Sequence, residues 1–407
     1  MPATGFGALD GVRVIDLTLM LAGPFCTQML ADQGAEIIKI EPLAGDDTRR
    51  SGPFHAEDRL RLFGGYYASV NRNKRSLALD LKTPEGKQLL LDLVDTADIL
   101  VENYRAGVMD RLGLGYETLK QRNPKLVYAA IRGFGDPRTG ASPYAEWPAF
   151  DVVAQAMGGI MQITGPDRDT PIKVGPGVGD LMPAAMCAFG VAAALVHARK
   201  TGEGQFVDVS MVDSVLSLCE RIVHQHSFRN EVPHPEGNRH PLIAPFGLFP
   251  AADGWVTIAC HTDAWWAILC RLIARDDLIE DPRTATSPAR VENRDYVYGE
   301  IGAFTSSRSK AELLELLGGK VPFGPVYDVR DIVADPHFAA RGMVVEVPHP
   351  GLEHNVAIAG VPIKMTATPG GVHRGAPVLG QDTDAILSEL GRSDEAIATL
   401  RKARVVG

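Results

Sequence analysis

The chain has 407 residues, of which 45% are hydrophobic and 22% charged, the composition of an ordinary globular protein. A chain of this length buries enough apolar surface to fold without disulfides or metals. Its 41 basic and 50 acidic residues give a net charge of -9, which argues against nucleic-acid and membrane-surface proteins, because both need a basic face.

The five cysteines are scattered and form no CxxC pair, which predicts reduced thiols, no metal site and a cytoplasmic location. The N-terminal residues 1–11 have no basic start followed by an apolar core, so no signal peptide is expected. The longest apolar stretch, 181–196, is shorter than the roughly 20 residues that span a bilayer. We therefore expect no membrane and no nucleic acid among the partners.

The first third of the chain alternates β-rich and helical segments. A strand over 12–17, a helix over 23–35 and a strand over 36–40 form a β-α-β unit. The cycle continues with strands at 76–81, 99–102 and 126–132 and helices at 83–95 and 112–122. Because crossover connections make the strands parallel, we expect an α/β fold with a parallel sheet.

Three regions are expected along the rest of the chain. Residues 1–225 form the N-terminal part of a large domain, with a strong helix over 181–199. Residues 226–330 form a smaller α/β domain with its linkers, because the segment 230–250 is dense in Pro, Gly, Asn and His. Residues 331–407 return to the large domain and end in a helix over 384–390.

Several common catalytic and binding motifs do not occur in the sequence. The connection TLMLAGP after the first strand has one glycine, whereas a dinucleotide site needs several. The run VGPGVGD at 174–180 lacks the GK[ST] of a phosphate loop, and neither GxSxG nor HExxH is present. His224 and His226 lie two residues apart on a predicted helix and are expected to be ordinary surface or packing histidines.

Asp180 follows the glycine-rich run and stands where the helix over 181–199 is expected to begin. Aspartate at such a position is most often an N-cap, and in isolation this interpretation is favoured. The helix dipole also favours the ionised carboxylate that a nucleophile requires. Three neighbouring glycines would let a bulky substrate approach the backbone. The cap and the nucleophile are compatible, and both stay open.

A basic cluster surrounds the strand over 76–81 in this acidic chain. Its members are Arg72, Lys74, Arg75 and Lys82. Such a cluster is either a solvated face or a site for a phosphate-bearing ligand. Arg105 and Arg111, which follow the strand over 99–102, would add to such a site. The residues alone leave both interpretations open.

Six stretches, spread along nearly the whole chain, carry a resemblance to a known family. They are VRVIDLTLMLAGPFCTQMLADQGAEIIKIEP, NRNKRSLALDLKTPEGK, DILVENYRAGVMDRLGL, FDVVAQAMGG, GVGDLMPAAMCAFGVAAALVHARKTGEGQFVDVSM and APVLGQDTDAIL. In this order they resemble the class III (CaiB/BaiF-type) coenzyme A transferases, the family of formyl-CoA transferase. The resemblance implies a Rossmann-like large domain with a parallel sheet, a smaller α/β domain, and two interlaced subunits in a homodimer.

The resemblance implies that Asp180 is the catalytic nucleophile. Its carboxylate would attack the thioester carbonyl of the donor acyl-CoA and form an acyl-aspartyl anhydride. The released CoA thiolate would then form an aspartyl-CoA thioester, and the acceptor acid would reverse these steps. Because one activated acyl group is exchanged for another, no ATP, metal or permanently bound cofactor is expected, and coenzyme A enters as a substrate.

The resemblance also implies a set of CoA-binding positions. They are Leu21, Ala22, Leu79, Asp80, Leu81, Lys82, Asn103, Tyr104, Arg105, Arg111 and Phe150. Under this interpretation the phosphates of CoA are the ligand of the basic cluster.

The chain departs from formyl-CoA transferase at several positions. Leu21, Pro42 and Phe150 stand where that enzyme has glutamine, arginine and tyrosine, and GNRHPLIAPFG replaces a glycine-rich loop. We therefore expect a dicarboxylic acid such as succinate, as donor or acceptor, rather than formate and oxalate. Arg239 and His240 are then either ligands of a distal carboxylate or surface residues.

Two alternative functions remain open. An enzyme similar to α-methylacyl-CoA racemase needs two acid/base groups around one carbon atom. Phe150 stands where the racemases have a histidine, directly before the aspartate that matches Asp151, and phenylalanine cannot move a proton. A non-catalytic CoA-binding subunit of a hetero-oligomeric transferase would not need the nucleophile Asp180.

Overall fold

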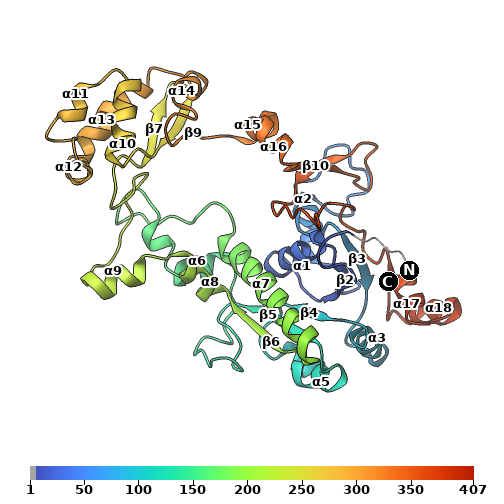
Figure 1. Cartoon of the computed structure of the whole chain (residues 1–407). Helices are drawn as coiled ribbons and strands as arrows, with labels where there is room; N and C mark the ends of the chain where they lie inside the picture. The colour runs from blue at the N-terminus through green and yellow to red at the C-terminus, as the bar shows by residue number, and fades with distance from the viewer. Residues whose placement is uncertain (1–5) are drawn as a thin grey trace. The chain divides into compact units, whose positions relative to one another are not determined.

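The structure, a computed structural model, describes residues 6–407, so that part of the N-terminal segment examined for a signal peptide lies outside the described residues. The first compact unit contains a six-stranded sheet in the order β3-β2-β1-β4-β5-β6, and all neighbouring strands are parallel (Figure 1). The strands are β1 (Arg13–Asp16), β2 (Glu36–Glu41), β3 (Lys74–Ala78), β4 (Ile99–Glu102), β5 (Val127–Arg132) and β6 (Phe206–Ser210). The predicted α/β fold with a parallel sheet is confirmed.

Helices cover both faces of this sheet. Alternate strand residues such as Ile15 and Tyr128 form one core with Leu90 and Leu119, which lie on α3 (Pro84–Val94) and α5 (Tyr116–Arg122). The other face packs against α1 (Ala22–Asp32) and α7 (Val178–Thr201). The strand order reverses between β1 and β4, which is the topological switch point of a doubly wound fold.

Local signals in the sequence explain where α3 begins. Thr83 is the N-cap, and its hydroxyl accepts a hydrogen bond of 3.0 Å from the backbone N–H of Gly86. Pro84 occupies the first helical position, where its missing N–H costs nothing. The predicted helix over 83–95 is therefore confirmed, with ends that differ by one residue.

Two predicted helices differ from the structure. The helix expected over 112–122 begins later, as α5, because Leu112 ends a separate helix, α4 (Val108–Leu112), where Gly113 adopts a left-handed conformation at φ 76°. The helix expected to close the chain is α17 (Thr383–Glu389), but α18 (Asp394–Lys402) follows it with Ser393 as its N-cap. Apolar periodicity did not detect α18, because only Ile397 on this helix is buried.

The remaining elements of the first unit surround the sheet. This unit comprises the residues up to Ile160 together with Lys173–His224 and Pro336–Gly407. Its further elements are η1 (Asp47–Arg50), α2 (Gly65–Val70), α6 (Asp151–Met157), α8 (Met211–Leu218), α16 (Pro336–Ala340) and the antiparallel pair β10 (Val344–Val347) and β11 (Val356–Ala359). Near the C-terminus, Val406 bridges to Leu79, so the end of the chain lies against the residues that follow β3.

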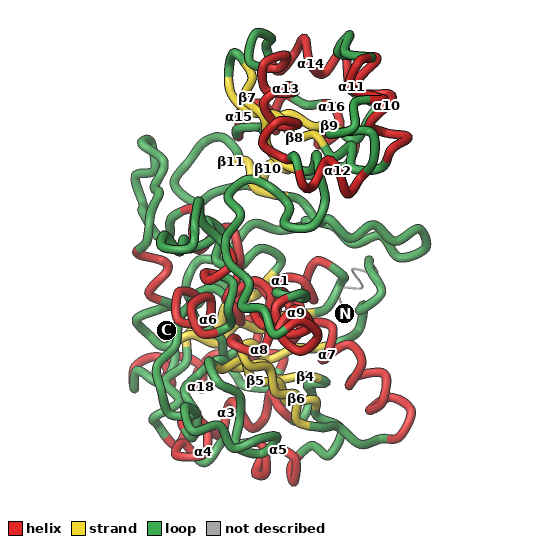
Figure 2. The backbone as a smooth tube through the Cα atoms, turned by 90° about the vertical axis from the view of Figure 1, so that its left-hand side faces the viewer, coloured by secondary structure: helices red, strands yellow, loops and turns green. Residues whose placement is uncertain are grey.

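A second compact unit comprises Met161–Ile172 and Gln225–Asp335. Its antiparallel sheet, β7 (Gly247–Ala251), β8 (Gly254–Ile258) and β9 (Phe323–Pro325), packs with helices around a core that contains Phe249 and Trp266 (Figure 2). The helices are α10 (Asp263–Leu272), α11 (Asp277–Glu280), α12 (Ser287–Glu292), α13 (Arg294–Thr305), α14 (Lys310–Leu317) and α15 (Val329–Ala334), with η2 (Met161–Ile163) in the first segment. Helix α9 (Ile222–Arg229) contains the junction between the two units.

Helix α7 is long and apolar enough, by length and composition alone, to cross a membrane, with a mean hydropathy of 1.8 over its most apolar window. In the structure it packs against α1, β5 and β6, as the core helix of a globular unit does. Cys187 of α7 forms a hydrogen bond with Cys26 of α1 between the two helices. The apolar composition of α7 is therefore explained in part by this packing.

Two lysines lie fully buried in the first unit beside buried carboxylates. The Lys74 ammonium lies 3.0 Å from Asp16 at the end of β1, and Lys39 lies 3.5 Å from Asp46. Burial lowers the pKa of Lys74 to about 8, although Asp16 opposes the shift. Burial raises the pKa of Asp16, but Lys74 and Lys39 outweigh it and hold that pKa below its usual value. Both partners are thus charged at neutral pH inside the protein.

We expect Asp16→Asn to reduce the free energy of unfolding by about 3 kcal/mol or more, because it leaves the Lys74 charge buried without its partner. The matched change Asp384→Asn breaks an exposed pair with Arg401 and should cost less than about 1 kcal/mol. Urea titrations of the wild type and both variants at pH 7 and pH 9 measure the free energies of unfolding. The loss of unfolding free energy caused by Asp16→Asn should be smaller at pH 9 than at pH 7, because at pH 9 the folded state can hold Lys74 in its neutral form. Equal losses in the two variants would contradict this role of the buried pair.

Candidate active site

Asp180 lies in the first turn of α7, but it is not the N-cap. Helix α7 begins at Val178 with Gly177 as its N-cap, and the N–H of Asp180 donates to the Gly177 carbonyl at 3.0 Å. The prediction that Asp180 caps the helix is therefore wrong by one turn. Its carboxylate remains at the positive end of the helix dipole, which favours the ionised form.

A second carboxylate, Asp151 at the start of α6, caps α7 instead. Its Oδ1 accepts a hydrogen bond of 2.8 Å from the N–H of Gly179. Gln155 holds the same carboxylate through contacts of 2.9 and 3.0 Å, and the Lys173 ammonium lies 3.3 Å from its Oδ2. A side chain at Gly179 would meet the Asp151 carbonyl oxygen at 2.5 Å, so this close approach requires glycine.

The surroundings of Asp180 change its protonation. Burial and, to a smaller extent, the negative charge of Asp151 raise the pKa of Asp180 to about 7, although Lys173 opposes the shift. The carboxyl group therefore exchanges a proton close to neutral pH. A perturbed carboxyl group at a helix N-terminus is a candidate for chemistry.

Two loops that predictions assigned to the site lie side by side at the switch point of the sheet. One follows β1 and contains Leu21, directly before Ala22 at the start of α1, and the other follows β4 and contains Asn103. The Asn103 amide joins them, because its Oδ1 accepts from the Leu19 N–H at 2.9 Å and its Nδ2 donates to the Leu19 carbonyl at 2.7 Å. Ligands of doubly wound folds bind in this crevice.

The loop after β1 also reaches the catalytic candidate. A Cβ atom on Gly177 would lie 3.2 Å from the Leu21 side chain, so Leu21 lies against the N-cap of α7. Tyr66 of α2 belongs to the same region, because burial raises its pKa and the charges of Asp180 and Asp151 raise it further. Sequence reasoning missed Tyr66, and no motif in the sequence points to it.

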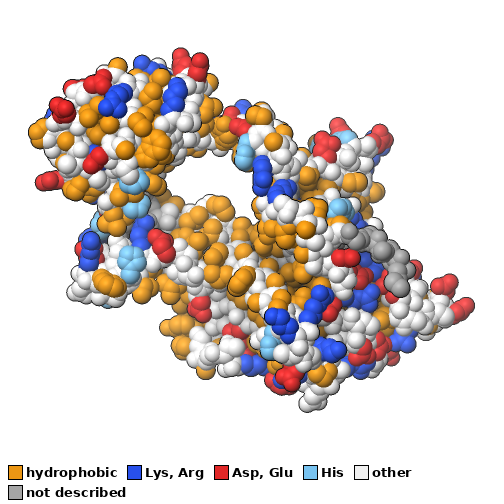
Figure 3. Space-filling view, viewed as in Figure 1, with side chains coloured by type: hydrophobic (Ala, Val, Ile, Leu, Met, Phe, Trp, Pro, Cys, Tyr) orange, Lys and Arg blue, Asp and Glu red, His pale blue; other side chains and the backbone are white. Residues whose placement is uncertain are grey.

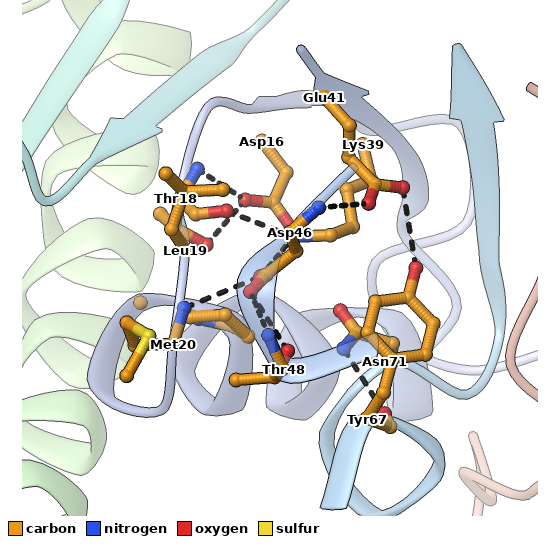
Figure 4. A network of polar contacts seen from close by, with 12 residues as sticks. Asp16, Thr18, Leu19, Met20, Lys39, Glu41, Asp46, Thr48, Tyr67 and Asn71 are labelled. Atoms are coloured by element: carbon orange, nitrogen blue, oxygen red, sulfur yellow. Dashed lines mark hydrogen bonds and ion pairs between the residues drawn. The ribbon is translucent and has the colours of Figure 1, made fainter. Parts of the chain in front are cut away.

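A strained residue lies between these features. Met20, directly before Leu21, has a φ of 69°, a left-handed backbone conformation that residues other than glycine rarely adopt. Its N–H donates to the buried carboxylate of Asp46 at 3.2 Å, and Asp46 also accepts from the backbone and hydroxyl of Thr48 (Figure 4). Strain of this kind persists where surrounding contacts hold the chain, and it is common at ligand sites.

The basic cluster divides into internal and exposed members. Arg72 and Lys74 are buried and pair with Asp32 and Asp16, so the prediction that they meet phosphates is wrong. Arg75 pairs with carboxylates on two other elements, Glu36 and Glu389. The paired carboxylates lie far away in the sequence, which is why the cluster alone did not predict them.

The other predicted CoA-binding residues follow β3 and β4. After β3, Leu79 is buried, Asp80 and Leu81 are half-buried, and Lys82 is exposed. After β4, Tyr104 is half-buried, its N–H donates to Glu102 at 2.7 Å, and Arg105 and Arg111 are exposed. Among residues 6–407, no carboxylate pairs with Lys82, Arg105 or Arg111. Phe150, directly before Asp151, is 62% exposed.

Histidines elsewhere in the chain do not join this site. His224 and His226 are both exposed on α9, as predicted for surface residues. Within the described part of the chain, one group of side chains has donor atoms close enough to share a metal ion, namely His55, Glu57 and His354, whose donor atoms lie within 4.8 Å of one another. All three are exposed, and none belongs to the predicted site.

Comparisons with known proteins identify the family of the chain. A model of CoA-transferase family III matches residues 9–383. The succinyl-CoA:mesaconate CoA-transferase of Haloarcula hispanica is 48% identical over 388 residues, which are 95% of this chain and 97% of that protein. The human succinyl-CoA:glutarate CoA-transferase is 34% identical over 405 residues, which are 98% of this chain and 90% of that protein.

A solved structure agrees as well. The crystal structure of a CAIB/BAIF family protein from Brucella suis matches with a TM-score of 0.83 and 36% sequence identity, over 95% of this chain and 100% of that one. The strand order, the position of Asp180 and these relatives lead to one conclusion. The chain belongs to CoA-transferase family III.

Proposed function

We propose that the protein transfers CoA from an acyl-CoA donor to a carboxylic acid, and that a dicarboxylic acid such as succinate serves as donor or acceptor. One observation carries the proposal: a half-buried carboxyl group, Asp180, lies in the first turn of α7 beside the loop that contains Leu21. The names of relatives support the class of acid, since they include succinyl-CoA:mesaconate and succinate–glutarate CoA-transferases.

Asp180 acts as the nucleophile in four balanced steps. Its carboxylate attacks the donor thioester carbonyl, giving an acyl-aspartyl anhydride and CoA thiolate. The thiolate attacks the aspartyl carbonyl and releases the donor acid from an aspartyl-CoA thioester. The acceptor carboxylate attacks this thioester and expels the thiolate again, and the thiolate then attacks the acceptor acyl carbonyl and frees Asp180. One thioester is exchanged for another, so no permanently bound cofactor is required.

CoA occupies the crevice at the switch point. We assign its binding to residues in the loops that follow β1, β3 and β4, to Ala22 of α1 and Arg111 of α4, and to Phe150. The assigned residues are Leu21, Ala22, Leu79, Asp80, Leu81, Lys82, Asn103, Tyr104, Arg105, Arg111 and Phe150. The exposed cations Lys82, Arg105 and Arg111 support a phosphate-bearing ligand, because phosphate and guanidinium groups form charge-assisted hydrogen bonds.

The proposal includes a homodimer with interlaced chains. Large apolar side chains are exposed on α6, α7 and α8, and Figure 3 shows hydrophobic side chains gathered over these helices. They are Val152, Met157, Phe189, Val196, Leu216 and Leu218. An exposed apolar patch marks an interaction surface, and a second copy of this chain is the partner we assign to it.

The proposal includes a cytoplasmic location and a division of the chain into a large and a small domain. Five free, buried cysteines support a reducing compartment such as the cytoplasm. Residues 1–225 and 331–407 form the domain that binds CoA and carries Asp180, and residues 226–330 form the small domain. The two compact units support this division for residues 226–330, whereas Met161–Ile172 belongs to the second unit and departs from it.

A second candidate function is proton transfer at the carbon next to a thioester carbonyl. A carboxyl group with a pKa of about 7, as at Asp180, also suits a general base. Such a racemase needs a second acid/base group, and Phe150 offers none beside Asp151. Incorporation of solvent deuterium into the acyl carbon would distinguish this candidate from CoA transfer. The intact Asp180 also argues against a non-catalytic CoA-binding subunit.

We expect Asp180→Asn to reduce CoA transfer by at least about a thousandfold, because the amide removes the nucleophile, while CoA affinity stays nearly unchanged. The matched control Asp394→Asn changes the same residue type in the first turn of the exposed helix α18. Mass spectrometry with succinyl-, acetyl- and formyl-CoA and a panel of acids measures the products. Transfer by Asp180→Asn at the wild-type rate, or rapid deuterium uptake by the wild type, would overturn the mechanism.

The pH dependence should follow the pKa of Asp180. Because the carboxylate must be ionised, kcat/KM should rise with pH up to about 7 and then level off. Asp151→Asn removes a charge that raises this pKa, so the rising part of the plot of kcat/KM against pH (the acid limb) should move to lower pH. Lys173→Met removes a charge that lowers it, so the limb should move to higher pH. Identical limbs in all three proteins would show that another group controls the rate.

Removal of an exposed cation at the switch point should weaken CoA binding. Lys82→Ala and Arg111→Ala should each raise the Kd of CoA about five- to tenfold, because each loses a charge-assisted contact with a phosphate. Lys402→Ala, an exposed lysine on α18, is the control and should leave the Kd unchanged. Isothermal titration calorimetry measures all three. Unchanged affinity in both test variants would remove the phosphate assignment.

A further inference from the structure

A group of metal-binding side chains lies in the first unit, outside the candidate active site. His55, Glu57 and His354 are exposed, and their donor atoms lie within 4.8 Å of one another. All three residues belong to the first compact unit. The scattered cysteines predicted no metal site, but that argument does not apply to a site built from histidine and glutamate. The sequence did not reveal this group, because His354 lies near the other end of the chain.

Two loops bring these residues together. His55 and Glu57 lie in the loop that precedes α2, and His354 lies in the connection between β10 and β11. Helix α2 also contacts β11 (Figure 1). The two loops approach closely at Gly351, where an added Cβ atom would meet Oδ1 of Asp58 at 2.3 Å. Packing therefore holds the two loops together without a metal ion.

Ring contacts connect the same two loops. Phe63 in the first loop is buried, and its ring lies 4.8 Å from that of His349 in the second loop and 5.3 Å from that of Tyr67 on α2. The rings of His55 and His354 lie 5.0 Å apart in an edge-to-face arrangement. The candidate ligands thus stand on backbone segments that a buried aromatic contact already positions.

Two histidines and a glutamate are a donor set that suits Zn²⁺, which often keeps a water molecule as its fourth ligand. His354 Nδ1 lies 3.8 Å from Glu57 Oε2. His55 Nδ1 accepts the N–H of Glu57 at 3.2 Å, so this nitrogen carries a lone pair. Tetrahedral zinc with bonds of about 2.1 Å holds its ligands about 3.4 Å apart, so the donor atoms need to shift by about 1 Å. Because all three side chains are exposed, rotamer changes can supply these shifts.

A buried carboxylate beside the group gives an independent indication of a cation. Asp58, the residue after Glu57, is 4% exposed. Its Oδ1 accepts the N–H groups of Leu60 and Arg61, each at 3.0 Å. Its Oδ2 is buried and accepts no hydrogen bond from residues 6–407. A buried carboxylate oxygen without a partner is costly, and a divalent ion at the neighbouring group, or water bound to that ion, would offset the cost.

We propose that His55, Glu57 and His354 bind one Zn²⁺ ion, which fastens the loop before α2 to the connection between β10 and β11. The ion takes no part in the proposed transfer of CoA, and the site does not depend on that function. The fastened loop leads into α2, which carries Tyr66. Metal binding should therefore stabilise the part of the first unit that borders the candidate active site.

Calorimetric titration of the full-length protein with Zn²⁺, without a histidine tag, tests the proposal. One ion should bind per chain, and His55→Gln and His354→Gln should each raise its Kd about a hundredfold or more. Even the loss of a residue that only hydrogen-bonds to a metal ligand weakens binding about 10- to 100-fold. His197→Gln is the matched control and should leave the Kd unchanged, because His197 is an exposed histidine of the first unit outside the group.

Two further measurements report whether the ion fastens the loops. Zn²⁺ at about a hundredfold excess over its Kd should raise the Tm of the wild type by about 3 °C and leave that of His354→Gln unchanged. Zn²⁺ should also slow cleavage by trypsin after Arg59, an exposed residue between Glu57 and α2. This protection should occur in the wild type and in His197→Gln, but not in His354→Gln.

The outcomes decide between a metal site and a simple surface contact. No Zn²⁺ binding by the wild type, or equal affinity in the wild type and both histidine variants, would overturn the inference and leave an ordinary histidine–glutamate contact. Binding that changes neither the Tm nor the cleavage after Arg59 would overturn the fastening of the loops. Asp180→Asn should bind Zn²⁺ with the wild-type Kd, so failure of the proposed transfer activity would not affect this test.

Discussion

The fold of the first unit depends on two buried lysines that end among carboxylates at one edge of the sheet. Lys74 donates to Asp16 and to the Pro24 carbonyl, and Lys39 donates to the Thr18 carbonyl and lies beside Asp46. Charges are costly to bury, so each must find several partners. These partners lie on both sides of the loop between β1 and α1, and the cost of burial therefore fixes the path of that loop.

The path of this loop determines the surroundings of Asp180. Asp46 accepts a hydrogen bond from the N–H of Met20, which has a strained conformation (Figure 4). The next residue, Leu21, lies against Gly177 at the N-terminus of α7. Asn103 joins the same loop to the loop after β4. A chain of contacts thus runs from the buried ion pairs to the catalytic candidate, and each step is a hydrogen bond or a packing contact within one compact unit.

The sequence predicted what depends on local pattern and missed what depends on distant partners. Alternating segments predicted the parallel sheet and the helix α3, because these signals lie within a few residues of one another. The prediction that Arg72 and Lys74 bind phosphate was wrong, because their partners Asp32 and Asp16 come from other elements. Asp180 stands near the predicted helix start, but the cap of α7 comes from Asp151 on α6, which no local pattern contains.

Asp151 caps α7 and Asp180 has the raised pKa, and these two roles connect the fold to the proposed chemistry. A neutral cap at the start of α7 would leave the pKa of Asp180 lower, because burial alone would then raise it. A carboxylate cap adds a nearby negative charge, and Lys173 limits its effect. The burial that raises the pKa also limits the access of water to the Asp180 carboxyl group, which would protect the proposed anhydride from hydrolysis. Under the proposed function, the burial that shelters the Asp180 carboxyl group from water is therefore also the main reason that its pKa lies near 7.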